Sequence, residues 1–242
     1  MASDFDPRAV KAMVFDTFGT VVDWRGSIIA EGESYWKPVK GIDIDWPAFA
    51  DAWRGKYGPS MNKVRSGELP WTKLDDLHRL ALEMNLEEFK VTGLSETDKQ
   101  HLNLVWHRLN AWPDAPSGLA RLKSRYLIAP LSNGNLSLLT EMAKFAGLPW
   151  DCVLGADLFQ HYKPDPETYL GAAAILGLEP GQVMMTAAHV GDLEKARELG
   201  LRTAYVHRAN EGGPGRERPR PADGDFDVVA DDFRDMAAKL GL

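Results

Sequence analysis

Four short polar segments of the chain carry side chains suited to nucleophilic and acid–base chemistry. They are residues 16–20, 131–135, 161–165 and 186–192. Together they supply carboxylates, a lysine, a histidine, hydroxyls and an amide, which is a set able to form and break a covalent intermediate. Each lies at the end of an apolar run or before an expected helix. In an open parallel sheet such positions converge at one edge, where ligands bind.

The strongest of these signals is Asp16, which ends the apolar run 12–15 and is followed by Thr17, Phe18, Gly19 and Thr20. Backbone N–H groups in such a turn can hold an anion or orient the carboxylate. An aspartate leaving a strand can also act as a helix N-cap or a turn former. The segment alone leaves both interpretations open.

The other three segments favour the catalytic interpretation. Ser132 and Asn133 follow a second apolar run, and His189 and Asp192 follow another. Lys163 precedes Pro166, which opens a helix that carries Tyr169 in its first turn.

Short apolar runs alternate with amphipathic stretches along most of the chain. We expect strands at 12–15, 126–131, 183–186 and 203–206, with a last edge strand at 227–229, each buried on both faces. Helices are expected at 136–146, 166–176, 192–199 and 231–240. This order predicts an α/β fold with a doubly wound, Rossmann-like parallel sheet.

Residues 24–112 contain no convincing strand and are rich in tryptophan. Helical patterns at 47–65, 72–84 and 96–109 predict an all-helical cap inserted after the first strand. The predicted division is a core domain of residues 1–22 and 112–242 and a cap domain of residues 23–111. A cleft between them is the expected ligand site.

Residues 207–225 are rich in glycine and proline and predict a long loop. Four arginines (Arg208, Arg216, Arg218 and Arg220) are matched there by four acidic residues (Glu211, Glu217, Asp223 and Asp225). A surface loop is the simpler interpretation, and a lid over the cleft is the alternative.

Composition narrows the class of protein. The 242 residues are 44% apolar and 26% charged, which is typical of a globular chain, and the net charge of −7 argues against nucleic acid as a partner. The single cysteine allows no disulfide framework, and no apolar run is long enough to cross a membrane. Residues 1–11 do not resemble a signal peptide. We therefore expect a cytoplasmic location.

In these motifs the chain resembles the haloacid dehalogenase superfamily. The order Asp16-Thr17-Phe18-Gly19-Thr20, Ser132-Asn133-Gly134, Tyr162-Lys163-Pro164-Asp165 and Asp192 spans the whole sequence. Trp53-Arg54 and Ala187-Ala188-His189 narrow the resemblance to the type II dehalogenases that act on L-2-haloacids.

The resemblance implies hydrolytic dehalogenation of short L-2-haloacids, such as haloacetates and 2-halopropionates, to 2-hydroxy acids. Asp16 attacks C2, displaces halide and forms an aspartyl ester, which water then cleaves. Lys163 is the implied charge partner of Asp16. The remaining implied roles are halide binding by Arg54 and Asn133, and binding of the substrate carboxylate by Ser132 and the backbone N–H groups near Thr17 and Phe18. Thr20 is expected to bond to Asp16 or to nearby backbone.

The second step is less defined. Asp192 matches the residue that orients or activates water, and it could equally hold Lys163 by an ion pair. Tyr169 is expected to order this network or to pack in the core. His189 stands where we expect asparagine, and its ordinary pKa near neutrality suits it to share the work of a base. The alternative is that it only fills space near Asp192.

Two positions separate this activity from its alternatives. Phosphatases of the superfamily carry an acid two residues after the nucleophile, where this chain has Phe18, and a further acid where it has Ala187. We therefore expect no metal and no cofactor. A Mg²⁺-dependent phosphatase is the alternative enzyme, and a non-catalytic binding protein is the third class. Related enzymes are often homodimers, so a homodimer is expected by analogy only.

Overall fold

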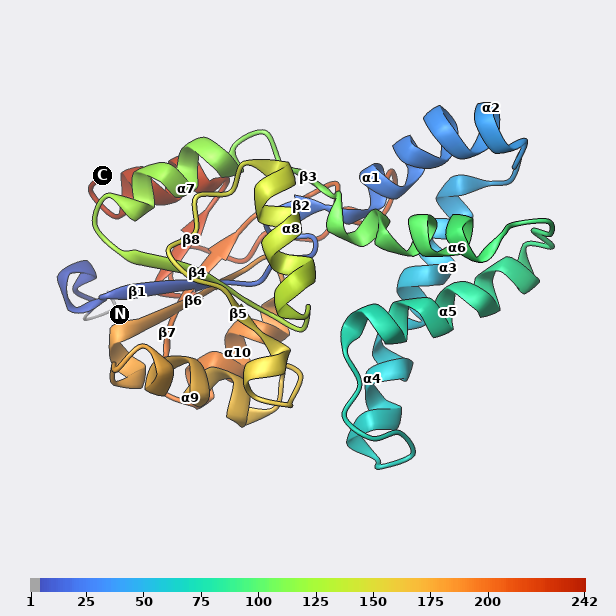
Figure 1. Ribbon diagram of the computed structural model, residues 1–242. Coiled ribbons are helices and arrows are strands. Elements are labelled where there is room, and N and C mark those ends of the chain that lie inside the picture. Colours follow the sequence, from blue (N-terminus) through green and yellow to red (C-terminus); the bar gives the residue numbers. More distant parts are fainter. Residues whose placement is uncertain (1–4) are drawn as a thin grey trace.

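The computed structural model describes residues 5–242 as a layered α/β unit joined to a group of helices (Figure 1). The layered unit is built on a six-stranded sheet whose neighbouring strands are all parallel. The strand order is β5-β4-β1-β6-β7-β8. In that order the strands are Leu154–Gly155, Leu127–Ser132, Ala12–Phe15, Val183–Ala187, Arg202–Val206 and Val228–Ala230. The predicted α/β parallel sheet is thus confirmed.

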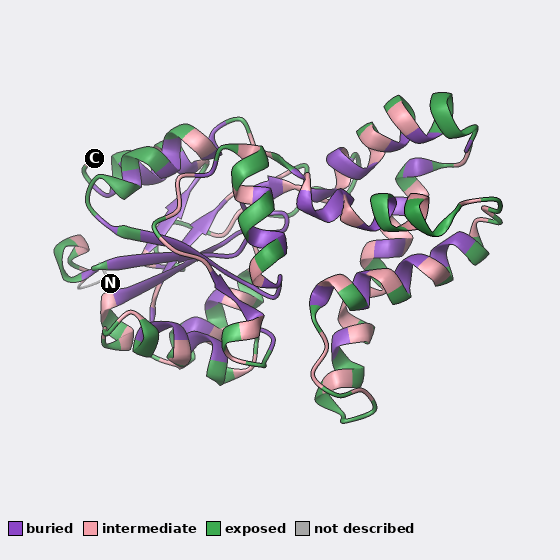
Figure 2. Ribbon diagram, in the orientation of Figure 1, coloured by how far each residue is buried: buried purple, intermediate pink, exposed green. Residues whose placement is uncertain are grey.

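The central strand β1 shows why these apolar runs become strands. All four of its residues are buried. Met13 and Phe15 belong to one hydrophobic cluster and Val14 to another, on the opposite face of the sheet. A strand that alternates between two cores must be apolar throughout, as the sequence is. Figure 2 shows the resulting continuous burial of the strands.

Helices cover both faces of the sheet (Figure 1). One face packs against α7 (Ala115–Lys123), α8 (Leu136–Ala146) and α11 (Phe233–Lys239), and the other against α9 (Pro166–Ile175) and α10 (Val190–Glu198). The sequence pattern predicts four of these five helices within a few residues. It does not predict α7, and it also misses the two-residue edge strand β5, which is too short to give a periodic signal.

The inserted helices form a separate group to one side of the sheet (Figure 1). They are α1 (Trp24–Glu31), a π-helical segment (Gly32–Trp36), α2 (Lys37–Lys40), α3 (Trp46–Gly55), α4 (Tyr57–Arg65), α5 (Leu74–Glu88), α6 (Glu96–Asn103) and a 3₁₀ segment (Leu104–His107). An antiparallel pair, β2 (Val22–Asp23) with β3 (Asn110–Ala111), joins them to the rest of the chain. The expectation of no strand in residues 24–112 is therefore wrong at β3.

The helical pattern at 47–65 corresponds to two helices in the structure. The structure ends α3 at Gly55 and starts α4 at Tyr57. Pro59 explains the break, because its ring would clash with the Gly55 carbonyl and it has no N–H to donate. Likewise, the helix expected over 96–109 ends at Asn103 and continues as the 3₁₀ segment.

The division into a core of 1–22 and 112–242 and a cap of 23–111 stays a prediction, and its residues 1–4 lie outside the described part of the chain. Among residues 5–242, no helix combines the length and apolarity needed to cross a membrane.

Candidate active site

A pocket of about 310 Å³ lies where the carboxyl end of the sheet faces the inserted helices. Eight of the predicted site residues line it: Asp16, Phe18, Arg54, Asn133, Lys163, Tyr169, His189 and Asp192. Tyr57, Pro164 and Gly191 complete the lining and were not predicted. Thr17, Thr20 and Ser132 do not line the pocket, although all three are buried next to residues that do.

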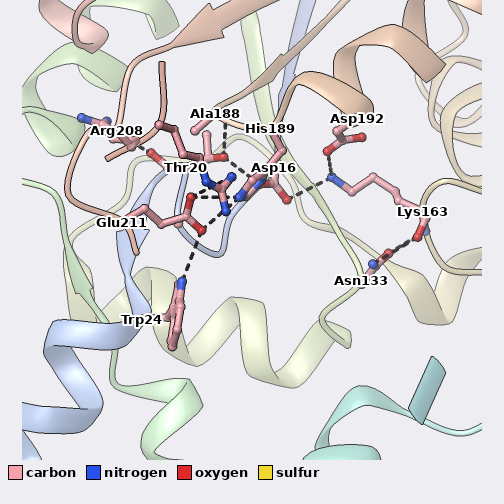
Figure 3. Close-up of polar contacts among 12 residues, drawn as sticks. Asp16, Thr20, Trp24, Asn133, Lys163, Ala188, His189, Asp192, Arg208 and Glu211 are labelled. Carbon is pink, nitrogen blue, oxygen red and sulfur yellow. Dashed lines mark hydrogen bonds and ion pairs between the residues drawn. The ribbon is translucent and has the colours of Figure 1, made fainter. Parts of the chain in front are cut away.

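Asp16 is held by three side chains at the end of β1 (Figure 3). Its Oδ1 accepts a hydrogen bond from Lys163 Nζ at 3.0 Å. Its Oδ2 accepts from Thr20 Oγ1 at 2.6 Å and lies 2.9 Å from His189 Nδ1. Burial alone raises the pKa of Asp16, but Lys163, His189 and Thr20 outweigh burial and hold that pKa well below its ordinary range. Asp16 is therefore an ionised carboxylate.

Lys163 bridges Asp16 and Asp192. Its Nζ lies 2.5 Å from Asp192 Oδ2, and Tyr169 donates its hydroxyl to Asp192 Oδ1 at 2.5 Å. Burial lowers the pKa of Lys163, but the two carboxylates outweigh burial and leave that pKa above its ordinary value. The ammonium is thus a fixed positive charge, and the predicted ion pair between Lys163 and Asp192 is present.

Asn133 fixes the loop that carries Lys163. Its Oδ1 accepts from the Lys163 N–H at 2.6 Å, and its Nδ2 donates to the Lys163 carbonyl at 3.3 Å. Ser132 lies behind it, with its hydroxyl oxygen accepting from the Gly134 N–H at 3.2 Å.

The turn after Asp16 presents two free donors. Within residues 5–242, neither the Thr17 N–H nor the Phe18 N–H has a protein acceptor. Gly19 adopts φ +85°, which closes the turn, and the Thr20 hydroxyl accepts from the Ala188 N–H at 3.0 Å. Thr20 therefore makes both of the contacts that the sequence left as alternatives.

Arg54 enters the pocket from α3 with spare hydrogen-bonding capacity. Its guanidinium carbon lies 4.0 Å from the centre of the Tyr57 ring and 5.6 Å from that of Trp24. Its Nη1 is buried and has no hydrogen-bond partner in the described chain. A buried guanidinium N–H without a partner favours an anionic ligand at this point.

His189 lies between two carboxylates, one of which the sequence analysis did not identify. Its Nδ1 faces Asp16, and its Nε2 lies 3.0 and 3.1 Å from the two carboxylate oxygens of Glu211 (Figure 3). Burial lowers the pKa of His189, but the two carboxylates outweigh burial and raise that pKa to about 9. The ring is therefore an imidazolium at neutral pH. The prediction that its pKa suits a base near neutrality is wrong, and the ring contacts Asp16 and Glu211 instead of only filling space near Asp192.

The segment of residues 207–225 is more than a surface loop. Glu211 is only 3% exposed, and Arg208 is 8% exposed. Arg208 pairs with Asp114 at 2.8 and 2.9 Å and donates to the Thr20 carbonyl at 2.9 Å. Arg208 therefore pairs with an acid outside the loop, which the charge balance within residues 207–225 does not indicate. Only the fold could have revealed this, because Asp114 lies 94 residues away in sequence.

Replacing Arg208 by Met should lower the free energy of unfolding by about 3–5 kcal/mol, because it leaves the Asp114 carboxylate buried without its partner. Arg216→Met is the matched control, since the Arg216 side chain is 62% exposed and pairs with Asp51 near the surface. We expect the control to lose less than about 1 kcal/mol. Urea unfolding measures the free energy of unfolding of both variants. Equal losses would mean that the pair of Arg208 with Asp114 does not hold the turn that contains Thr20.

Within residues 5–242, no group of three or more His, Cys, Asp and Glu side chains is arranged to hold a metal ion.

The chain is similar to proteins of known activity. The model of the haloacid dehalogenase-like hydrolases matches residues 10–212. The (S)-2-haloacid dehalogenase 4A of Burkholderia cepacia is 30% identical over 210 residues, which cover 85% of this chain and 86% of that protein. Phosphoglycolate phosphatases are also among the relatives.

Two solved structures are more similar in sequence. One is an L-2-haloacid dehalogenase and the other a defluorinating L-2-haloacid dehalogenase. Each is 45% identical to this chain with a TM-score of 0.91 and covers 96% of it. The matches cover 99% of the first structure's chain and 96% of the second's.

Proposed function

This chain belongs to the haloacid dehalogenase-like hydrolases, and from that membership we propose that it hydrolyses the carbon–halogen bond of short L-2-haloacids, giving 2-hydroxy acids. It is an enzyme of the (S)-2-haloacid dehalogenase type. The observation that carries the proposal is an ionised, buried Asp16 beside an apolar side chain, Phe18, where a phosphatase needs an acid. Phe18 is 2% exposed and packs edge-on against Tyr57 and Trp106.

The nucleophile in this proposal is Oδ1 of Asp16. Each carboxylate oxygen has room for about two hydrogen bonds, so the two donors on Oδ2 occupy it and the single donor on Oδ1 leaves a lone pair free. Oδ1 attacks C2, the carbon–halogen bond breaks with its electron pair on the halide, and an aspartyl ester forms with inversion at C2. A halide needs no proton to leave, which explains why an apolar Phe18 suffices.

The substrate in the first step needs two anion sites. The Thr17 and Phe18 N–H groups supply donors for its carboxylate, and Ser132 supports the adjoining strand end. Arg54 and Asn133 bind the departing halide. Arg54 Nη1 has no other partner in residues 5–242. Asn133 Nδ2 gives one hydrogen to the Lys163 carbonyl and keeps a second for the halide.

In the second step, water attacks the Asp16 carbonyl carbon. Asp192 accepts a proton from that water, and Lys163 and Tyr169 hold Asp192 in place. The ester carbon–oxygen bond then breaks, the proton returns to the leaving alkoxide oxygen, and Asp16 is restored. The sum is one haloacid and one water converted to one hydroxy acid, one halide and one proton.

The same proposal holds that the reaction needs no metal. Ala187 offers no side-chain oxygen where a phosphatase of the superfamily has its further acid. A paired assay, run once with a chelator and once with added Mg²⁺, tests this. One arm measures chloride from L-2-chloropropionate and halide from haloacetates, and the other measures phosphate from monoesters. We expect halide and no phosphate; phosphate release that requires Mg²⁺, without halide, would overturn the proposal.

Replacing Arg54 by Lys should lower kcat/KM about 10- to 100-fold, because the charge stays but the planar fork is lost. Arg25→Lys is the control, since Arg25 forms a fork on Asp51 in the same helical group but does not line the pocket. Halide release by both variants provides the measurement. An unchanged kcat/KM in Arg54→Lys would refute the role of Arg54 in halide binding.

The proposal also covers the cellular location and the oligomeric state of the enzyme. We propose a cytoplasmic location, which suits a chain with the single cysteine Cys152, and a homodimeric assembly by analogy with related enzymes. The partner is a small haloacid, with no nucleic acid and no membrane.

A further inference from the structure

The two oxygens of Asp16 have different surroundings, and this difference matters after the first step. If Oδ1 becomes the ester oxygen, Oδ2 becomes the ester carbonyl oxygen. Its neighbours are then the Thr20 hydroxyl at 2.6 Å and His189 Nδ1 at 2.9 Å. Negative charge develops on this oxygen when water attacks, so two donors already in place would stabilise it.

Ester formation also removes a charge next to His189. The ring then keeps one carboxylate in direct contact, Glu211, at 3.0 and 3.1 Å from Nε2. Without an anionic partner a buried imidazolium loses its proton easily. The state of His189 in the second step therefore depends on Glu211.

We infer that Glu211 is a positioning residue for ester hydrolysis, which keeps His189 an imidazolium so that its Nδ1–H and the Thr20 hydroxyl form an oxyanion site on Asp16 Oδ2. The inference rests on the proposed function and assigns His189 an electrophilic role instead of that of a base. Water attacks, the carbonyl electron pair moves to Oδ2, and it returns when the bond to the alkoxide breaks. His189 keeps its proton throughout, and Asp192 handles the proton of the water.

The surroundings of Glu211 fit a fixed carboxylate. Trp24 Nε1 donates to Oε1 at 3.3 Å, and Arg218 lies 3.2 Å from Oε2. A Cβ at Gly19 would lie 2.1 Å from Oε1, so only glycine in the Asp16 turn leaves room for this carboxylate. Burial raises the pKa of Glu211, but His189 first and Arg218 next outweigh burial and lower that pKa, so Glu211 is ionised.

The pH dependence of His189 involves every charged group around it. Asp16 and Glu211 contact the ring and favour its charged form. Lys163 contacts Asp16, and Arg218 contacts Glu211. Asp23 faces Glu211. Arg54 and Asp192 line the same pocket as the ring. In the free enzyme the effect of the two carboxylates on the pKa of His189 outweighs that of burial. The imidazolium is therefore lost only as the pH rises through about 9.

Replacing Glu211 by Gln tests the inference, with Glu217→Gln as control, since Glu217 is exposed on the same segment. We expect Glu211→Gln to release the first halide at nearly the wild-type rate but to hydrolyse the ester about 10-fold more slowly, because the donor loses its charge. Rapid quenching and mass spectrometry of the Asp16 peptide should show the ester accumulating. The alkaline limb of kcat should move down by at least about one pH unit, toward the ordinary histidine pKa.

Unchanged ester occupancy and an unchanged alkaline limb in Glu211→Gln would overturn the inference while leaving the proposed function intact. Absence of any ester in the wild-type enzyme during turnover would instead refute the proposed function. The two failures are therefore distinguishable.

A second measurement does not depend on activity. Asp16→Asn imitates the charge lost on ester formation, and the His189 ring can be titrated in it by NMR. We expect the pKa of His189 to stay above its ordinary value of about 6.5 in this variant and to fall below it in the double variant with Glu211→Gln. A pKa already below the ordinary value in Asp16→Asn alone would contradict the role of Glu211.

Discussion

Replacing Asp16 by Asn should lower halide release by at least about 10,000-fold, because an amide oxygen is a poor nucleophile and no other group can take its place. The other pocket carboxylate, Asp192, is held by Lys163 and Tyr169 and acts on the water of the second step in the proposed mechanism. Chloride release from L-2-chloropropionate measures the loss.

Asn fits the space of Asp16 and keeps an oxygen for Lys163, so the pocket should still bind the substrate carboxylate. Calorimetric titration with substrate checks this. Asp76→Asn, an exposed change on α5, serves as the control and should be fully active. Halide release by Asp16→Asn within tenfold of wild type would mean that a different group attacks.

Replacing Lys163 by Met should lower kcat/KM by at least about 1,000-fold and destabilise the fold by about 3–5 kcal/mol. The change leaves Asp16 and Asp192 buried without the ammonium they share. Thermal unfolding and steady-state kinetics measure the two effects.

The pH profile of Lys163→Met gives a more specific readout. In the wild type the low pKa of Asp16 keeps the nucleophile ionised well into acid. Without Lys163, the effect of burial raises the pKa of the Asp16 carboxyl. The acid limb of kcat/KM should therefore move to higher pH. Lys195→Met on α10 is the control, since the one acidic partner of Lys195 among residues 5–242 is Glu198, near the surface. An acid limb identical to that of the wild type would show that Lys163 is not the charge partner.

The sequence predicts the part of the site that follows directly from sheet topology. Asp16 comes at the end of β1, Asn133 just after β4 and His189 just after β6, and β1 pairs with both other strands. Parallel neighbours bring their carboxyl ends together, so apolar runs and the polar residues after them suffice to place these groups. Arg54 is different, because only the resemblance to a family pointed to it.

Glu211 could not be predicted, for a physical reason. It reaches the site through a glycine- and proline-rich segment with no periodic pattern, and its partners Trp24 and His189 lie 187 and 22 residues away. Charge counting offers Glu211 only the arginines of its own loop, whereas the fold adds the buried imidazolium of His189 to its contact with Arg218. By contrast, the break between α3 and α4 was predictable, because Pro59 was present in the sequence.

A single turnover in ¹⁸O water, with enzyme in excess over L-2-chloropropionate, tests the aspartyl-ester route most directly. In the proposed mechanism the oxygen of the first product comes from Asp16 and the water oxygen enters the Asp16 carboxylate. We therefore predict unlabelled 2-hydroxypropionate and one ¹⁸O in the peptide that contains Asp16. Labelled product and an unlabelled peptide would mean that water attacks the substrate itself, which would contradict the mechanism.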